Sequence, residues 1–394
     1  MIRVCHVQLW PMLSGVQRVM LSLLERIDRT RYKPQVICRQ PGPLTRELDH
    51  LGIRCHFVPQ LVRPIRPHLD WWAYRSLRKL FRELRPDIVH THSSKPGFLG
   101  RLAARAADVP HVIHHVHGFS FHEYSSRIVQ FVFPRLERLA GRSCDRVVFV
   151  NEEERAWAVG NGVLPAEKSR TIYNGVDLNV FAPPSPERRA ELRRRLDVPD
   201  DCTVVPFLGR LVRQKQPLIL ADIAARLNGE LAGDRAWQIW VCGDGPLRDG
   251  LLHRCRQQGT AERVRAFRWH ERPQDVLGAA DLALLPSLWD GMPLSLLEAA
   301  GTGLPVVCSA IRGNREVVTA ETGFLCSPRD AGQYATRIAR LIADDELRAS
   351  MGRAARQRAE AMFDADLMAA RIGELYGGLA GSAAEPLPAF RRAA

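Results

Sequence analysis

The residues best suited to chemistry lie in the second half of the chain, and the first of them follow an apolar segment that ends at Leu208. Gly209 allows the backbone to turn close to a ligand. Arg210 and Lys215 then place a planar cation and a compact cation at the start of the next expected helix. This arrangement suits a phosphate group, although a solvated basic turn would have the same composition.

A second candidate turn follows the next apolar segment. Gly243, Asp244, Gly245 and Pro246 succeed one another there. A nucleotide base or ribose could lie against so flexible a backbone. The alternative is a plain turn with Asp244 or Gly245 at a helix cap.

The strongest segment spans residues 286–299, where a helix is expected to begin with free amides and a favourable dipole. A proline suits the first turn of such a helix. The residues at this helix start are Gly291, Met292, Pro293 and Leu294.

Two carboxylates accompany that helix start. Asp290 lies just before the expected helix and Glu298 lies inside it. One carboxylate could face a sugar while the other accepts hydrogen bonds from a ribose. The alternative is that Asp290 caps the helix and Glu298 faces solvent, but the apolar residues around Glu298 disfavour solvent exposure.

The first half contributes a turn at Gly15 and a cluster of histidines. The cluster comprises His90, His92, His111, His114, His115, His117 and His122. Histidine is a common metal ligand. We predict no metal site, because neighbours in a strand such as His114 and His115 point to opposite faces and no nearby carboxylate or cysteine set completes a shell.

Length and composition limit the class of protein. The chain has 394 residues, 46% of them apolar and 25% charged, as in a globular protein of two domains. No stretch approaches twenty consecutive apolar residues. The nine cysteines include no C-x-x-C pair, so we expect reduced thiols in the cytoplasm.

The net charge of +13 is concentrated in the first half. Residues 1–180 carry 27 Lys and Arg against 16 Asp and Glu. A basic surface suits lipid headgroups, pyrophosphate groups or nucleic acid. A solvated arginine-rich surface would give the same composition.

Strand and helix patterns alternate in both halves, which predicts parallel sheets covered by helices. Expected strands are 2–8, 34–39, 53–58, 87–91, 111–117 and 146–150, then 202–208, 237–242, 264–269, 282–285, 305–308 and 323–325. Expected helices are 15–28, 43–51, 70–85, 96–107, 125–140 and 152–161, then 187–196, 215–228, 246–258, 273–279, 292–302, 313–319 and 330–342.

Each half therefore has the pattern of a Rossmann-like unit. We place an N-terminal domain at 1–182 and a C-terminal domain at 183–362, with the hinge in a proline-rich segment around Pro183. A helix at about 363–378 is expected to pack back on the first domain. Residues 379–394 are expected to form a flexible tail.

Together these motifs resemble the retaining glycosyltransferase family 4, which has the GT-B fold: two Rossmann-like domains facing each other across a cleft. The resemblance rests on the run from Pro286 to Ser309, on Gly209 to Lys215, on Gly243 to Pro246, and on Asn174 to Asp177 before Phe181. It covers the chain to about residue 378.

The resemblance implies roles for most of the candidates. Arg210 and Lys215 would bind the diphosphate, Glu298 the ribose, and the backbone from Gly291 to Leu294 the distal phosphate and the sugar. His117 matches the family's active-site histidine, close to the transferred sugar, and Gly15 its turn near the donor phosphate. His92 is a further candidate, for orienting phosphate or acceptor. The chain departs from the family at Asp290, where glutamate is usual; aspartate keeps the charge but reaches about one methylene less.

The resemblance also implies transfer with retention of configuration, no metal and no other cofactor. Asp364 and Asp366 form an Asp-x-Asp, but no strand precedes them, so we expect a helix start. The donor is expected to be a UDP-hexose or UDP-N-acetylhexosamine, with GDP-mannose next. Segments 90–97 and 116–122 resemble bacterial members that extend polyprenyl-diphosphate-linked glycans for surface polysaccharides.

Such an acceptor would place the protein in the cytoplasm, at the inner face of the plasma membrane. Residues 61–67 lead into 70–81, whose aromatic and cationic mixture is typical of an interfacial helix. The loop 118–124 could meet a lipid-linked acceptor. The alternative for the helix is that Trp72, Leu77, Leu80 and Phe81 pack on the sheet.

Three other classes of protein remain open at this point. A nucleotide-sugar epimerase of similar fold would need acid and base groups and no acceptor. A nucleic-acid binder would explain the basic half, but the phosphate-site residues argue against it. A non-catalytic sugar-nucleotide sensor would fit the departure at Asp290.

Overall fold

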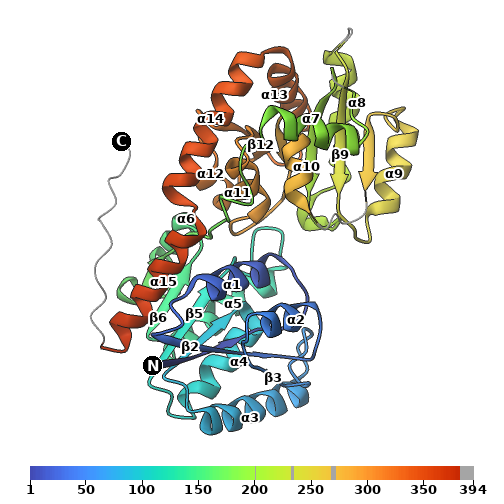
Figure 1. The fold of residues 1–394 in the computed structure, drawn as a ribbon. Helices are drawn as coiled ribbons and strands as arrows, with labels where there is room; N and C mark the ends of the chain where they lie inside the picture. The colour runs from blue at the N-terminus through green and yellow to red at the C-terminus, as the bar shows by residue number, and fades with distance from the viewer. Residues whose placement is uncertain (200, 232–234, 268–271, 382–394) are drawn as a thin grey trace. The chain divides into compact units, whose positions relative to one another are not determined.

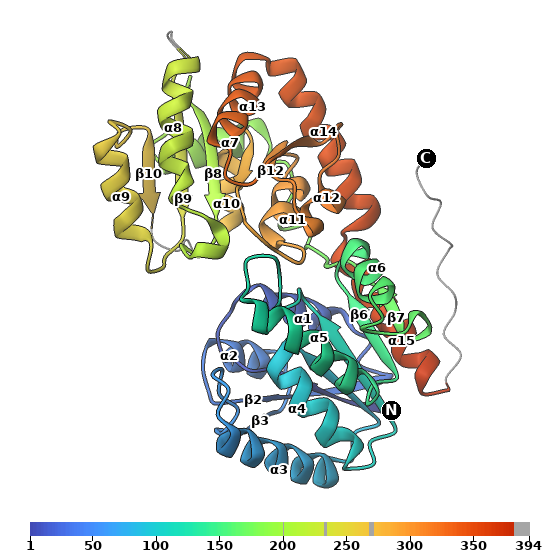
Figure 2. The same ribbon diagram turned by 180° about the vertical axis from the view of Figure 1, so that it is seen from behind.

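The computed structural model describes residues 1–199, 201–231, 235–267 and 272–381, which form two α/β units (Figures 1 and 2). Unit 1 comprises Met1–Gly175 and the residues from Ala365 onward, and unit 2 comprises Val176–Asp364. The predicted division lay between residues 182 and 183. Most of the predicted tail, from residue 382, lies outside the described residues.

The chain crosses between the units twice, and the two crossing segments are bonded to each other. The N–H of Val176 donates to the carbonyl of Phe363 at 2.8 Å. Val176 also pairs with Asp364 in an isolated parallel bridge. Arg356 donates to three carbonyls nearby, those of Leu178, Phe181 and Gly301.

Unit 1 is built on a seven-stranded parallel sheet in the order β3-β2-β1-β4-β5-β6-β7. Its strands are β1 Ile2–Val7, β2 Tyr32–Cys38, β3 Cys55–Phe57, β4 Ile88–His92, β5 His111–Val116, β6 Arg146–Phe149 and β7 Ser169–Thr171. Strand β7 was not predicted, because it is short and carries no apolar side chain. The order reverses between β1 and β4, and open parallel sheets bind ligands beside such a point.

Seven helices in the described residues of unit 1 accompany that sheet. They are α1 Gly15–Arg26, α2 Pro43–His50, α3 Pro67–Leu84, α4 Ser94–Arg105, α5 Arg127–Gly141, α6 Glu152–Gly160 and α15 Ala365–Leu379. Helix α15 packs against α1 (Figure 1). The hydroxyl of Tyr32 donates to the carbonyl of Gly373 at 2.8 Å, which ties α15 to unit 1.

Unit 2 has two three-stranded parallel sheets, in the orders β10-β9-β8 and β11-β12-β13. They meet where the N–H of Asp281, just before β11, donates to Val204 of β8 at 3.0 Å. The strands are β8 Thr203–Leu208, β9 Trp237–Cys242, β10 Val264–Phe267, β11 Ala283–Leu285, β12 Val306–Ser309 and β13 Gly323–Cys326.

The helices of unit 2 include one that the sequence analysis missed. They are α7 Pro186–Arg195, α8 Ile219–Glu230, α9 Arg248–Gln257, α10 Pro273–Ala279, α11 Leu294–Gly301, α12 Arg312–Val317, α13 Ala331–Ala343 and α14 Asp345–Met362. Helix α14 escaped prediction because small residues, not an apolar stripe, form much of its buried face. Gly352, Ala355 and Ala359 are buried there, and a Cβ at Gly352 would lie 2.3 Å from the carbonyl oxygen of Gly303.

None of the helices in these described ranges combines the length and the apolar content needed to cross a membrane.

Candidate functional site

Two loops of unit 2 form the core of the candidate site, and a glutamine joins them. The first loop, residues 209–216, follows β8, and the second, residues 286–293, follows β11. The backbone N–H of Leu288 donates to the carbonyl of Gln214 at 2.8 Å. The side-chain amide of Gln214 donates to the carbonyl of Trp289 at 3.0 Å. Gln214 was not among the predicted site residues, because nothing in the local sequence indicates this long-range contact.

Lys215 and Asp290, one from each loop, form an ion pair. Ser287 Oγ donates to Asp290 Oδ2 at 3.2 Å, and Gln214 Nε2 lies 3.4 Å from Oδ1. The two charged side chains are only 12% and 14% exposed. The lysine predicted to bind phosphate and the aspartate predicted to face the sugar therefore neutralise each other within this unit.

Arg210 is an exposed cation of the first loop, as is Arg213. Its guanidinium donates to Gln214 Oε1 at 3.3 Å. The same glutamine therefore contacts Arg210 in its own loop and Trp289 and Asp290 in the second loop. Arg210, Lys215 and Asp290 are thus brought together as the spacing of strand ends predicted.

The helix starts differ from the predicted ones at both loops. Lys215 belongs to a short 3-10 helix, Arg213–Lys215, and not to the start of α8. Gln216 has a positive φ of 49° and precedes a proline, which disfavours helical geometry. In the second loop Pro293 is the N-cap and α11 begins at Leu294, so the placement of Pro293 in the first turn was wrong.

Glu298 lies in α11 and is 9% exposed. The alternative that it faces solvent is therefore wrong. A buried carboxylate is costly unless polar groups satisfy it, so its surroundings within the unit must include such groups.

A further layer supports the second loop and was not predicted. A Cβ at Gly313 of α12 would lie 1.5 Å from the carbonyl oxygen of Gly291, so only glycine fits against this helix start. Ser309 Oγ donates to the carbonyl of Ser287. Asn314 Nδ2 donates to the carbonyl of Ser309 at 3.0 Å. Met292 is buried in the same loop.

Gly209 and Gly243 pack backbone to backbone. The N–H of Gly209 donates to the carbonyl of Cys242 at 3.1 Å, and a Cβ at Gly243 would lie 1.9 Å from the carbonyl oxygen of Gly209. Asp244 is exposed and accepts from the N–H of Gly245 at 2.8 Å. Packing alone accounts for glycine at position 243.

Gly15 has no such packing reason. It is the exposed first residue of α1, and no atom lies within 4 Å of a Cβ built there. The fold of unit 1 would accept a side chain at this position. A close ligand remains a physical reason for glycine at position 15.

His117 follows β5 and is half-buried, with its Nε2 3.1 Å from Nδ1 of His92. His92 is 1% exposed and its ring nitrogens lie against the imidazoles of His6 and His117, so a role in orienting phosphate or acceptor stays a prediction. Burial lowers the pKa of His117 to about 3. The cluster also includes His6 and Tyr376, which the sequence analysis did not select because they come from β1 and α15.

Two triplets of imidazoles in this cluster have ring nitrogens within 4.8 Å of one another. They are His6 with His90 and His92, and His92 with His115 and His117. By number and type such donors could hold a transition metal. Both triplets consist of histidines from neighbouring strands, and neither includes a carboxylate or a cysteine.

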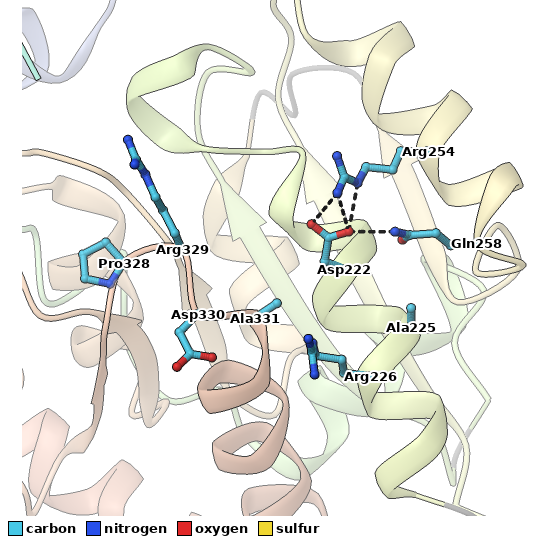
Figure 3. Close-up of a pocket in the computed structure, with 9 residues that line it drawn as sticks. All are labelled: Asp222, Ala225, Arg226, Arg254, Gln258, Pro328, Arg329, Asp330 and Ala331. Atoms are coloured by element: carbon cyan, nitrogen blue, oxygen red, sulfur yellow. Dashed lines mark hydrogen bonds and ion pairs between the residues drawn. The ribbon is translucent and has the colours of Figure 1, made fainter.

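A cavity of about 770 Å³ lies elsewhere in unit 2, between α8, α9 and the start of α13 (Figure 3). Asp222 in its wall accepts hydrogen bonds from Arg254 and, at 2.7 Å, from Gln258. None of the predicted site residues lines this cavity.

The two segments predicted to meet a membrane differ in exposure. In α3, Trp71 and Trp72 are 56% and 55% exposed, while Leu77 and Phe81 are buried. The packing alternative was therefore right for Leu77, Phe81 and the partly buried Leu80, and wrong for Trp72.

In the loop 118–124, Phe119 and Phe121 are buried and stacked, with ring centroids 4.5 Å apart. Both rings also contact Trp157. Phe119 and Phe121 therefore form part of the core, and the contact of this loop with a lipid-linked acceptor stays a prediction.

Helix α5 presents an apolar stripe that the sequence analysis missed. Its exposed apolar residues are Ile128, Phe131, Val132, Leu136 and Leu139. Their spacing places them along one side of the helix. The opposite side is held by the buried ion pair of Glu137 with Arg101 of α4, at 2.7 Å.

Two α/β units built on parallel sheets, with cations and carboxylates gathered at strand ends of the second, are those of the GT-B fold. Residues 13–180 match the sequence model described as Glycosyltransferase Family 4, and residues 188–358 match Glycosyl transferases group 1. The chain belongs to glycosyltransferase family 4.

Relatives of known name cover nearly the whole chain. The UDP-Gal:alpha-D-GlcNAc-diphosphoundecaprenol alpha-1,3-galactosyltransferase of Escherichia coli is 36% identical over 379 residues, which are 95% of this chain and 96% of that protein. The D-inositol 3-phosphate glycosyltransferase of Thermobispora bispora is 29% identical over 87% of this chain and 82% of its own length.

Solved structures confirm the fold. Anabaena HepE in complex with UDP and glucose superimposes with a TM-score of 0.81 at 20% identity, covering 96% of this chain and all of that one. Sucrose-phosphate synthase from Thermosynechococcus elongatus gives 0.81 at 20% identity over 97% of this chain.

Proposed function

We propose that this glycosyltransferase moves a hexose from a UDP-sugar to N-acetylglucosamine on a polyprenyl diphosphate, with UDP-galactose the first donor to test. The observation that carries the proposal is the pair of loops joined by Gln214, which gathers Arg210, Lys215 and Asp290 at strand ends. The identity to the E. coli galactosyltransferase supports the donor and the acceptor. The product would enter a bacterial surface glycan.

The roles follow from charge and burial. Lys215 exchanges Asp290 for the donor diphosphate, or bridges the two, while Arg210 adds a second cation. The backbone before α11 meets the distal phosphate at a helix N-terminus. Glu298 accepts from the ribose and Asp290 faces the sugar. In unit 1, His117 is the group offered to a hydroxyl of the sugar or the acceptor.

The reaction would then proceed by stabilisation of the leaving diphosphate, which is electrostatic catalysis. The departing phosphate takes the proton of the acceptor hydroxyl, so neither a dedicated base nor a metal is needed, and the configuration is retained. Activity in EDTA tests the metal claim, and NMR of the product linkage tests retention.

Thermal-shift measurements with UDP-galactose, UDP-glucose, UDP-N-acetylhexosamines and GDP-mannose test donor binding. We expect a UDP-sugar to raise the melting temperature of the wild type, and much less in Lys215→Ala or Glu298→Ala. Arg226→Ala is a matched control, because this cation lines the separate cavity of unit 2. The proposal fails if no nucleotide sugar stabilises the wild type.

A transfer assay then separates an enzyme from a sensor or an epimerase. The acceptor is a synthetic N-acetylglucosamine diphospholipid, and the product is followed by mass spectrometry. Stable binding without product under any acceptor would identify a sensor. Free epimerised sugar in the absence of acceptor would identify an epimerase.

We also infer that the protein works at the cytoplasmic face of the membrane and touches it with α5. Exposed apolar area flanked by cations is the pattern of an interfacial helix. The exposed arginines beside the stripe are Arg127, Arg135, Arg138 and Arg142. An anionic lipid surface complements these charges.

Sedimentation with anionic vesicles tests this contact. We expect binding that weakens with salt and that falls sharply in the double variant Ile128→Ser, Phe131→Ser. Val180→Ser, which removes an exposed apolar side chain from unit 2, is the control. The pair Trp71→Ser, Trp72→Ser measures the share of α3. Absence of vesicle binding at low salt would refute the contact.

A further inference from the structure

Five imidazoles lie on one face of the sheet of unit 1. His6 of β1 is directly opposite His90 of β4, and His92 is opposite His115 of β5. Residues two apart in a strand share a face, so His117 continues the row just beyond β5. Tyr376 of α15 contacts the inner end of this cluster.

Three of these imidazoles form a continuous chain of hydrogen bonds. His6 Nδ1 lies 3.0 Å from His92 Nε2. His92 Nδ1 lies 3.1 Å from His117 Nε2. At the inner end His6 Nε2 lies 3.4 Å from the hydroxyl of Tyr376. His6 and His92 are fully buried, so no solvent intervenes.

The chain allows only two proton arrangements when its members are neutral. Burial lowers the pKa of His6 and of His117 to about 3, and that of His92 well below its usual value. A neutral imidazole has one N–H and one bare nitrogen. Each contact joins Nδ1 of one ring to Nε2 of the next, so all three rings carry the proton on Nε2 or all three carry it on Nδ1.

Tyr376 selects between these two arrangements. Its hydroxyl lies 2.6 Å from His90 Nδ1 and 3.4 Å from His6 Nε2. Hydrogen bonds donated by O–H are shorter than those donated by N–H, so the hydroxyl donates to His90 and its oxygen accepts from His6. The protons of His6, His92 and His117 then all lie on Nε2.

We propose that Tyr376, His6 and His92 are positioning residues that hold His117 in the Nε2–H tautomer, so that its Nδ1 accepts a hydrogen bond from a hydroxyl of the bound sugar or acceptor. The role of His117 beside the sugar rests on the proposed function. The tautomer itself does not, because it depends only on groups within unit 1.

A metal ion in the same cluster is the competing explanation, and the ring planes disfavour it. His115 and His117 stack with centroids 4.2 Å apart and planes within 16° of parallel. A metal lies near the plane of each imidazole that binds it, so stacked rings do not converge on one ion. The hydrogen-bonded chain needs no such rearrangement. Both ring nitrogens of the buried His115 lack a hydrogen-bond partner in the described residues, and stacking is the contact it makes with His117.

Imidazole NMR of the whole protein labelled with 15N-histidine tests the chain directly. Long-range 1H–15N correlations distinguish the two neutral tautomers, and His6→Gln, His92→Gln and His117→Gln assign the three rings. We expect all three to be Nε2–H at pH 7. Any Nδ1–H ring among them would overturn the proposal. Stoichiometric zinc or copper that disappears in His92→Gln would overturn it as well.

Tyr376→Phe then tests whether the hydroxyl of Tyr376 sets the donor-to-acceptor direction of the hydrogen-bonded chain. The ring keeps its edge contact with Tyr32, with centroids 5.6 Å apart, and only the hydroxyl is lost. We expect the Nε2–H resonances of His92 and His117 to move, although Tyr376 contacts neither in the chain. Tyr32→Phe is the matched control, since it removes a hydroxyl that binds Gly373 of the same helix. Equal spectra for Tyr376→Phe and wild type would refute the role of Tyr376.

The kinetic counterpart is a fall in kcat of about fivefold in Tyr376→Phe, as for the loss of one hydrogen bond, with KM for the donor unchanged. Tyr32→Phe should stay within about twofold of the wild type. If the wild type transfers no sugar at all, the proposed function fails while the tautomer result still stands. If transfer occurs but His117 is Nδ1–H, the proposed function stands and the proposed tautomer of His117 is refuted.

Discussion

The candidate residues of the two units are held in opposite ways. In unit 2 the loops present formal charges, and Lys215 and Asp290 neutralise each other while Arg210 stays exposed. In unit 1 the candidate His117 is neutral and is the outermost member of a buried row of imidazoles. One set is organised by charge in loops, the other by burial on a sheet.

The difference has a physical consequence for ligand binding. A charge pair in a loop can exchange one partner for an incoming phosphate, because the ligand replaces the lost Coulomb energy. The buried imidazoles are hydrogen-bonded to one another, so the positions of their protons are fixed before any ligand binds. Unit 2 is therefore suited to capture an anion, and unit 1 to present a hydrogen-bonding group of fixed polarity.

The largest expected effect is a dependence of folding stability on pH, which comes from the buried imidazoles of unit 1. The unfolded chain protonates His6 near pH 6.5, whereas the folded chain does so only near pH 3. Between these values the unfolded state binds more protons, so stability falls as the pH falls. Each such buried imidazole contributes up to about 1.4 kcal/mol per pH unit.

Urea unfolding at pH 7, 6 and 5 measures this slope above the range in which most carboxylates titrate. The slope is proportional to the number of protons that the unfolded state binds in excess of the folded state, and His6→Gln should reduce that number by up to about one. A stability independent of pH between 7 and 5 would contradict the burial of neutral imidazoles.

The second effect concerns the charge pair. Lys215→Ala should lower kcat/KM about a thousandfold, because it removes a cation from the leaving diphosphate and leaves Asp290 uncompensated beside it. The double variant Lys215→Ala, Asp290→Asn should be more active than Lys215→Ala alone, because it also removes the unpaired charge. Simple multiplication of the single effects would show that the pair is not coupled.

The sequence predicted most of the fold because strand and helix periods are local. Nearly all the strands and helices were placed, and the exceptions have particular causes. Strand β7 is three polar residues long, and α14 hides its buried face in small residues such as Gly352 and Ala355. Neither has the periodic apolar pattern on which prediction depends.

The site was predictable as far as strand ends reveal it. Arg210, Lys215 and Asp290 were found because loops after parallel strands gather at one edge. Gln214, Gly313 and Tyr376 were not found, since their roles come from contacts with distant segments. The ion pair of Lys215 with Asp290 was likewise not visible, because spacing gives the edge of a sheet but not which side chains meet there.

The third effect contrasts two glycines that were both predicted to bind the donor. Gly243→Ala should cost about 3 kcal/mol or more of stability, because its Cβ would meet the carbonyl oxygen of Gly209. Gly15→Ala should change stability by less than about 0.5 kcal/mol, since the position is exposed and open. If the donor approaches Gly15, the same variant lowers kcat/KM while its melting temperature stays unchanged. Normal activity in Gly15→Ala would remove Gly15 from the site.

The smallest expected effect, and the finest test of the charged loops, is Asp290→Glu. This change restores the residue usual in the family, yet we expect kcat/KM to fall by about threefold, a loss below 1 kcal/mol. The reason is that Ser287, Gln214 and Lys215 all contact the carboxylate of the shorter aspartate side chain. A glutamate is longer by one methylene and would lose the Ser287 contact. Ser287→Ala, which removes that contact without lengthening the side chain, should produce a loss of similar size. A higher kcat/KM in Asp290→Glu would mean that the longer reach of glutamate toward the sugar contributes more to catalysis than the contacts of the aspartate carboxylate.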